Sequence, residues 1–226
     1  MMVCIILARG GSKGIKNKNL QSIGGISLLG SSIKTAIYSG VTDHVFVSSD
    51  SEAILSEAKS FGAKVIKRPA ELASDTASSE SGLIHAIGEI EKALKSSIKT
   101  VLFIQATSPF LTSLDVVEAV SKYQSSHFNS LFTGFLSHKF IWQENGLFLS
   151  ALNHNPKKRV RRQDLPKEIA ENGALYIFNR DYFLKEKTRF CGRVGCSIMS
   201  EISSIDIDTT EDLELARMIY ESKKIS

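Results

Sequence analysis

The sequence is poor in cysteine and has no long hydrophobic run. Its 226 residues include three cysteines, Cys4, Cys191 and Cys196. No two of them form a CxxC pair, and no histidine–cysteine cluster has the spacing of zinc ligands, so a structural zinc site is excluded. The odd count argues against a disulfide framework, and we expect reduced thiols in a cytoplasmic protein.

Membrane and nucleic-acid partners are also disfavoured. No stretch approaches the ~18 apolar residues of a membrane-spanning helix. The apolar residues 1–8 have no charged segment before them and lead into a glycine-rich loop, so they predict a strand rather than a signal peptide. The net charge is only +4, which suits small anionic substrates. The basic cluster at 157–162 has no interleaved aromatic residues, unlike a nucleic-acid-binding platform.

Short apolar runs alternate with longer amphipathic segments through the first 136 residues. This alternation predicts an open, mostly parallel α/β sheet with helices on both faces, and the length fits a single domain, residues 1–226. The expected strands are 3–8, 44–49, 64–66, 100–105 and 130–135. The expected helices are 27–39, 51–61, 79–94, 113–123 and 209–222. An apolar run at 174–178 returns to the core.

The segment 137–171 interrupts this pattern. It contains the only tryptophan and the basic cluster, and it has little periodicity. We interpret it as an excursion from the core, either a small lobe or a dimerisation arm.

The loop after the first strand carries the clearest chemical signal. Residues 7–19 read LARGGSKGIKNKN, which is neither a Walker A motif nor a GxGxxG fingerprint. Its glycines let the backbone approach an anion, and Arg9, Lys13 and Lys18 can surround a triphosphate. Ligands of open α/β sheets bind beyond the carboxyl ends of the strands, where this loop lies. The alternative is a solvent-exposed loop with scattered charges.

Two further polar segments follow. RPAELASDTASS occupies 68–79, where a terminal serine can simply cap the next helix and Arg68 can pair with a neighbouring acid. QATSP occupies 105–109. It is either a turn closed by proline or a set of uncharged hydrogen-bonding groups suited to a polyhydroxylated sugar acid.

The last segment is SIDIDT at 204–209. On a strand, period-two spacing would place Asp206 and Asp208 on one face, where two carboxylates repel unless a cation such as Mg²⁺ lies between them. Alternatively, Asp208 caps the last helix and Asp206 is exposed.

Together these motifs resemble the N-acylneuraminate cytidylyltransferases, the bacterial CMP-sialic acid synthetase family. The resemblance extends over nearly the whole chain. It comprises LAR-x-x-SKG-x-x-x-KN at 7–19, RPAELASDTASS at 68–79, Q-x-TSP at 105–109, NGA-x-Y at 172–176 and SIDIDT at 204–209. The family has a Rossmann-like nucleotidyltransferase fold and is typically dimeric, with the excursion reaching into the partner's active site.

The resemblance implies roles at the matching positions. Lys18, Arg9 and Asp208 would be catalytic, with Lys18 stabilising charge at the α-phosphate and Arg68 lying near the cytosine. The nucleotide pocket would be formed by Arg9, Ser12, Lys18, Asn19, Arg68, Ala77 and Ser79. The acceptor sugar would be contacted by Gln105, Thr107, Tyr176 and Arg162. Mg²⁺ would be held by Asp206 and Asp208.

The implied reaction transfers CMP from CTP to the anomeric hydroxyl of a nonulosonic acid and releases pyrophosphate. Preorganised cations and Mg²⁺ would stabilise the charge that builds on the phosphoryl oxygens. The proton acceptor stays open between a metal-bound hydroxide and an aspartate such as Asp208.

Three departures bear on the acceptor, and one of them is the segment SHKFIW at 137–142, which is unlike the usual sialic-acid version. Ala106 stands where the family often has proline, and Glu171 precedes Asn172 where sialic-acid members often have Arg-Pro. They leave N-acetylneuraminate, legionaminate and KDN as open acceptors. A KDO-type cytidylyltransferase and a catalytically inactive sugar-nucleotide-binding homologue are the alternative functions.

Overall fold

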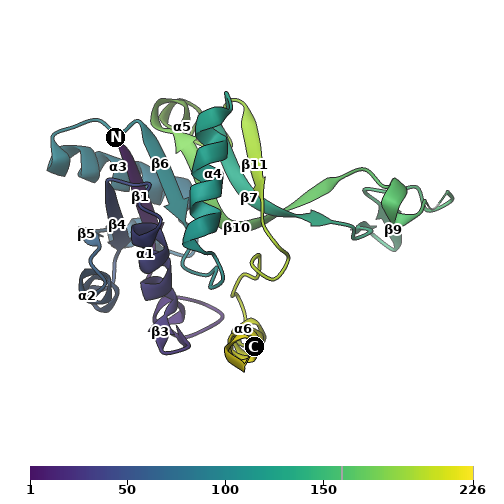
Figure 1. Ribbon diagram of the computed structural model, residues 1–226, viewed down its shortest axis with the longest axis horizontal. Helices are drawn as coiled ribbons and strands as arrows, with labels where there is room; N and C mark the ends of the chain where they lie inside the picture. Colours follow the sequence, from purple (N-terminus) through teal and green to yellow (C-terminus); the bar gives the residue numbers. More distant parts are fainter. Residues whose placement is uncertain (159, 226) are drawn as a thin grey trace.

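A seven-stranded sheet forms the centre of the molecule (Figure 1). The computed structural model describes residues 1–158 and 160–225, without the side chains of Arg162 and 223–225. The strand order is β11-β7-β10-β6-β1-β4-β5. The strands are β1 (Met2–Leu7), β4 (His44–Ser49), β5 (Lys64–Lys67), β6 (Thr100–Ile104), β7 (Ser130–Ser137), β10 (Glu168–Asn179) and β11 (Val194–Ile198). Only β10 runs antiparallel to its neighbours, so the expected mostly parallel α/β sheet is confirmed.

Strand β1 shows why the central strands are continuously apolar. Cys4 and Ile6 point into one core, shared with helices α1, α2 and α4, whereas Val3 and Ile5 point into a second core, shared with α3 and α5. Because successive side chains of a strand face opposite sides, a strand covered on both faces needs apolar residues at every position. The helices are α1 (Leu28–Tyr38), α2 (Glu52–Ser60), α3 (Ser79–Leu94), α4 (Ser113–Ser125), α5 (Arg180–Glu186) and α6 (Thr210–Ile225).

The predicted strands and helices lie at or near the residues expected for them. Helix α5, strand β11 and the two short hairpins described below were not expected. The sequence left 204–209 open between a strand and the cap of the last helix; the segment is irregular, with a turn up to Ser204 and no ladder beyond it. Thr209, rather than Asp208, caps α6: its hydroxyl accepts from the Asp212 backbone N–H at 3.2 Å.

The excursion is an arm that stands away from the sheet (Figure 1). Its base is the continuation of β7 and β10, which pair from Glu168–Ser137 to Glu171–Gly134. Its outer part contains the hairpin of β8 (Trp142–Asn145) and β9 (Phe148–Ala151), followed by a 3-10 helix at Arg162–Asp164. The arm is therefore fixed to the sheet by two strands.

Smaller elements complete the chain. A second hairpin, β2 (Ser22–Ile23) with β3 (Ile26–Ser27), follows the loop after β1, and 3-10 helices lie at Lys18–Leu20 and Ala70–Ala73. The three cysteines are free. Among the described residues, no helix is both long and apolar enough to cross a bilayer.

Candidate active site

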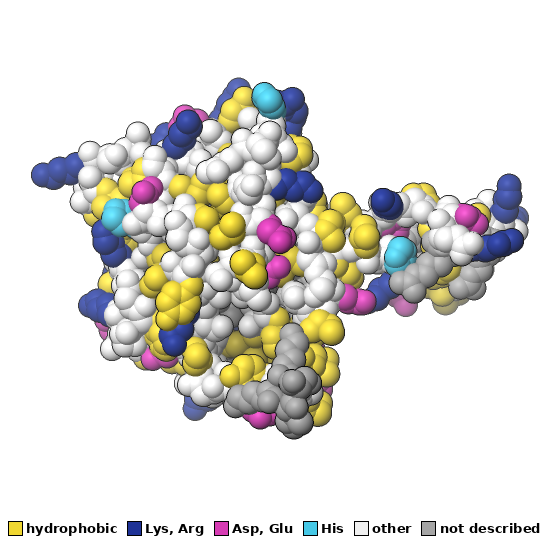
Figure 2. All heavy atoms as spheres, viewed as in Figure 1, with side chains coloured by type: hydrophobic (Ala, Val, Ile, Leu, Met, Phe, Trp, Pro, Cys, Tyr) yellow, Lys and Arg dark blue, Asp and Glu magenta, His cyan; other side chains and the backbone are white. Residues whose placement is uncertain are grey.

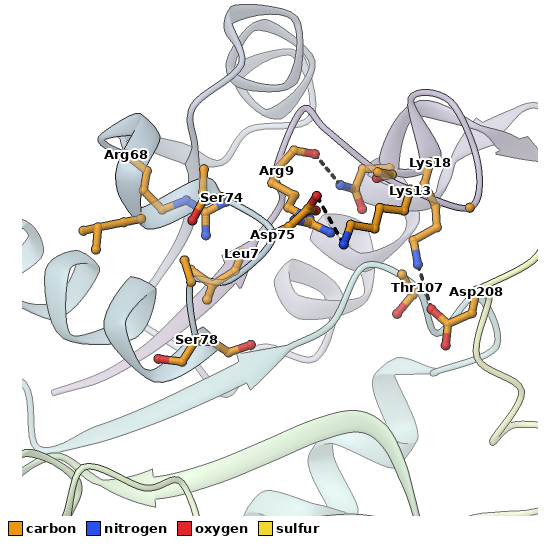
Figure 3. A pocket seen from close by; sticks show the side chains of 17 residues that line it. Leu7, Arg9, Lys13, Lys18, Arg68, Ser74, Asp75, Ser78, Thr107 and Asp208 are labelled. Carbon is orange, nitrogen blue, oxygen red and sulfur yellow. Dashed lines mark hydrogen bonds and ion pairs between the residues drawn. The ribbon is translucent and has the colours of Figure 1, made fainter.

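A cavity of about 400 Å³ lies beyond the carboxyl ends of β1 and β6. Figure 3 shows its wall, which combines the loop after β1, the segment before α3, and residues from the turns at Thr107 and Asp208. All seven residues predicted for the nucleotide line this cavity: Arg9, Ser12, Lys18, Asn19, Arg68, Ala77 and Ser79.

The loop after β1 is held by side-chain contacts rather than by regular structure. The Gly10 backbone N–H donates to Asp50 Oδ1 at 2.9 Å, and the buried Asn19 donates from Nδ2 to the Arg9 carbonyl at 3.0 Å. These two bonds fix both ends of the loop. Asn19 therefore shapes the cavity through the backbone of Arg9.

Lys18 joins this loop to the segment before α6. Its Nζ donates to the Ile207 carbonyl at 2.8 Å and to Asp208 Oδ1 at 2.9 Å (Figure 3). Lys18 side-chain exposure is only 16%, whereas Asp208 is 74% exposed. A small core that includes Ile15 and Ile207 packs the two segments together.

Gly14 is required for this close approach. A Cβ at Gly14 would lie 2.4 Å from the Asp208 carbonyl oxygen, well inside van der Waals contact. Two segments nearly 200 residues apart in sequence thereby place one ammonium and one carboxylate at the cavity wall.

Arg68 lies deeper in the wall. It is 6% exposed, and its backbone N–H donates to the Ser49 carbonyl at 2.8 Å. Its buried Nε has no hydrogen-bond partner among the described residues. Burial lowers the guanidinium pKa, and the Asp50 charge partly offsets that effect. A buried cation with a free donor is suited to a ligand that brings its own acceptors.

One carboxylate oxygen of Asp206 also lacks a hydrogen-bond partner among the described residues. This atom, Oδ1, is buried. Burial raises the Asp206 pKa, whereas the hydrogen bond from the Thr107 hydroxyl lowers it. Asp206 and Asp208 do not share a strand face as expected. Asp208 lines the cavity, but Asp206 does not. The unpartnered oxygen of Asp206 would fit a hard divalent cation that keeps water and phosphate ligands.

The residues predicted for the acceptor are more scattered. Thr107 lines the cavity, but Gln105 and Tyr176 do not. Tyr176 is 3% exposed, and its hydroxyl donates to Glu171. Burial and this carboxylate raise the Tyr176 pKa. The side chain of Arg162 lies outside the described part of the structure, so its predicted role is not placed.

Three charged residues of this region were not assigned roles from the sequence. Asp50 holds the loop, as described above. Asp75 contacts Arg9 Nη1 at 2.6 Å and Lys13 Nζ at 3.4 Å. Arg189 donates to Glu80 Oε1 at 2.8 Å, and its guanidinium lies 4.7 Å from the centre of the Tyr176 ring. Each contact joins segments distant in sequence, so local motifs carried no signal for it.

Comparisons with known proteins agree with this geometry. The chain is 30% identical over 241 residues to a CMP-N,N'-diacetyllegionaminic acid synthase from Campylobacter jejuni, covering 100% of this chain and 97% of that protein. It is 35% identical over 219 residues to an N-acylneuraminate cytidylyltransferase from Oncorhynchus mykiss, covering 95% of this chain but only 49% of the fish protein. It thus spans about half the length of that relative.

A solved structure supports the fold. A CMP:2-keto-3-deoxy-manno-octonic acid synthetase complexed with CTP superposes with a TM-score of 0.73 at 16% identity, covering 98% of this chain and 99% of that one. The model of the family described as cytidylyltransferase matches residues 3–225. With that match over nearly its whole length, the chain belongs to the cytidylyltransferase family of nucleotidyltransferases.

Proposed function

We propose that this cytidylyltransferase transfers CMP from CTP to the anomeric hydroxyl of a nonulosonic acid and releases pyrophosphate. The observation that carries the proposal is the gathering of all seven predicted nucleotide residues in one cavity of about 400 Å³. The names of the relatives from Campylobacter jejuni and Oncorhynchus mykiss, a legionaminic acid synthase and an N-acylneuraminate cytidylyltransferase, favour a nine-carbon acceptor.

The cations of the cavity suit a triphosphate. Arg9 and Lys18 bind and orient it, and Ser12 supplies a hydroxyl from the same loop. Lys18 is the more rigid of the two because Ile207 and Asp208 hold its ammonium. A fixed positive charge beside the α-phosphate stabilises the charge that develops as pyrophosphate leaves.

The opposite wall suits the nucleoside. Arg68 brings a buried donor, and Ala77 and Ser79 bring a small side chain and a hydroxyl at the start of α3. A base whose edge is bound by buried polar groups is distinguished from other bases, because a mismatched base leaves those groups unpaired. We therefore expect CTP to be used and ATP or GTP to be used barely.

Mg²⁺ is part of the proposal. Asp206 and Asp208 would hold it, and the unpartnered Oδ1 of Asp206 supports this assignment. When bound, the ion would neutralise phosphate charge during transfer. The proton of the acceptor hydroxyl needs a base, and Asp208 stays our prediction for that role.

We place the acceptor between Thr107 and the arm of a second subunit. The arm exposes apolar residues at its tip, including Leu147 at 97% and Phe148 at 77%. Figure 2 shows the arm standing clear of the body, with hydrophobic side chains at the junction between arm and body. Exposed apolar patches of this kind are typical of interaction surfaces. A homodimer would bury them and bring Arg162 of one chain towards the acceptor of the other.

The test is a pyrophosphate-release assay with CTP and a panel of acids: N-acetylneuraminate, legionaminate, KDN and the eight-carbon acid KDO. We expect turnover with a nine-carbon acid, loss of turnover in EDTA, and recovery with Mg²⁺. Turnover with KDO alone would favour the KDO-type alternative. No turnover with any acid, despite CTP binding, would favour an inactive homologue. Equal use of ATP would contradict the base specificity.

A further inference from the structure

Asp75 belongs to the RPAELASDTASS motif at 68–79, but no step of the proposed reaction uses it. It is one of two acids that line the cavity; the other is Asp208. Its carboxylate contacts Arg9 at 2.6 Å through Oδ1 and Lys13 at 3.4 Å through Oδ2. The two cations, both from the loop after β1, thus share the carboxylate of Asp75, as Figure 3 shows.

This arrangement differs from that of Asp208. The exposed carboxylate of Asp208 pairs with a single cation, Lys18, whose side chain is only 16% exposed and also donates to the Ile207 carbonyl. Asp75 lies in a turn after the 3-10 helix at Ala70–Ala73, and its side chain is 47% exposed. The bond from Arg9 lowers the Asp75 pKa, so the carboxylate is charged throughout the neutral range.

A triphosphate bound by Arg9 would meet this carboxylate. Like charges a few ångströms apart repel, and both anions need the same guanidinium and ammonium. The carboxylate and the polyphosphate therefore compete for the two cations. We propose that the Asp75 carboxylate is an internal competitor of the polyphosphate of CTP: it pairs with Arg9 and Lys13 while the cavity is empty, yields them to the polyphosphate, and takes them back as pyrophosphate leaves. This inference rests on the proposed function for its physiological ligand, but the contacts that carry it do not.

The consequence is that the Asp75 carboxylate weakens polyphosphate binding, because its ion pairs with Arg9 and Lys13 must be broken first. An exposed ion pair contributes little, so removal of the carboxylate should strengthen pyrophosphate binding by about two- to fivefold. A role in holding the loop in its binding-competent shape predicts the opposite sign, because loss of the carboxylate would then weaken binding. The direction of the change in pyrophosphate affinity therefore distinguishes competition from a role in holding the loop.

The experiment is calorimetric titration of inorganic pyrophosphate into the full-length protein. We expect Asp75→Asn to lower the dissociation constant about two- to fivefold and to increase product inhibition by pyrophosphate. Glu71→Gln is the matched control, because it removes the same charge from the same segment without contact to Arg9 or Lys13. We expect it to leave the constant unchanged, and Asp75→Glu to remain close to wild type.

Equal or weaker pyrophosphate binding by Asp75→Asn would overturn the inference, as would an equal gain in Glu71→Gln. A wild-type protein that does not bind pyrophosphate would also overturn it. Failure of the proposed function gives a different result. No acid would then support pyrophosphate release from CTP, but Asp75→Asn would still bind pyrophosphate more tightly than wild type in the titration.

Discussion

The two sides of the active site are built differently. The nucleotide side takes its side chains from one chain, and they converge on one cavity at the carboxyl edge of the sheet. On the acceptor side, Thr107 lies at the cavity, Tyr176 is buried against Glu171, and the arm projects away from both. Under the proposed function, this difference means that one chain would bind the nucleotide alone, whereas the acceptor would be bound with the arm of a second subunit.

The largest expected effect tests the nucleotide side directly. Lys18→Ala should lower turnover about a hundredfold, which corresponds to ~3 kcal/mol of transition-state stabilisation from one fixed charge. Lys13→Ala is the control: the Lys13 side chain is 74% exposed, and its Nζ lies 3.4 Å from Asp75 Oδ2. We expect a much smaller loss from it.

Steady-state kinetics distinguish the possible roles of Lys18. A fall in kcat at a similar KM for CTP supports a role in the transition state. A raised KM with unchanged kcat would make Lys18 a binding residue only. Similar mild losses in both variants would mean that the loop acts as a general electrostatic attractor.

An intermediate effect should come from the junction that positions Lys18. Gly14→Ala places a methyl group 2.4 Å from the Asp208 carbonyl, so the two segments must separate. Overpacking of this kind costs about 1–3 kcal/mol, and displaced catalytic groups should lower turnover about tenfold. Gly11→Ala is the matched control, because a Cβ at Gly11 meets no atom within 4 Å.

Thermal unfolding and turnover should be measured for both glycine variants. We expect Gly11→Ala to resemble the wild type in both. If Gly14→Ala kept full turnover, the close packing of the loop against 206–208 would be irrelevant to catalysis.

The smallest effect on the nucleotide side is expected from the arm. Replacement of Leu147 and Phe148 by serine should convert a dimer into a monomer and reduce turnover of the acceptor, but leave the CTP dissociation constant within about twofold of wild type. Replacement of Leu114 and Val117, which are exposed on the body at α4, is the control and should leave the dimer intact. Light scattering and CTP titration measure the two quantities.

A monomeric wild-type protein would refute the shared acceptor site. Weaker CTP binding in the arm variant would remove the proposed division between the two sides.

The same division describes what the sequence could predict. Strands β1, β4 and β6 were located because continuous apolar runs mark strands covered on both faces. Strand β11 was missed because it is a short edge strand with a glycine, Gly195, and mixed burial. The alternation at 204–209 resembled a strand, but only Ile207 is fully buried, and its N–H donates to the Thr107 carbonyl at 2.9 Å.

The candidate site divides likewise. The residues predicted for the nucleotide line one cavity because those within each motif are close in sequence and the strand ends bring the motifs to one edge. The contacts of Asp75 with Arg9 and of Glu80 with Arg189 join residues 66 and 109 positions apart. A single sequence holds no information about such pairings when no local pattern accompanies them.

The position of β10 has a consequence for biosynthesis. It lies between β6 and β7, and its residues Leu175–Asn179 pair with Thr100–Ile104. The ribosome therefore releases β6 with one open edge and β7 with two, because both neighbours of β7, β10 and β11, follow the arm. A chain that stopped within the arm would hold all seven residues predicted for the nucleotide but would expose unpaired apolar edges on β6 and β7 to aggregation. The strands that close these edges are made only with and after the arm.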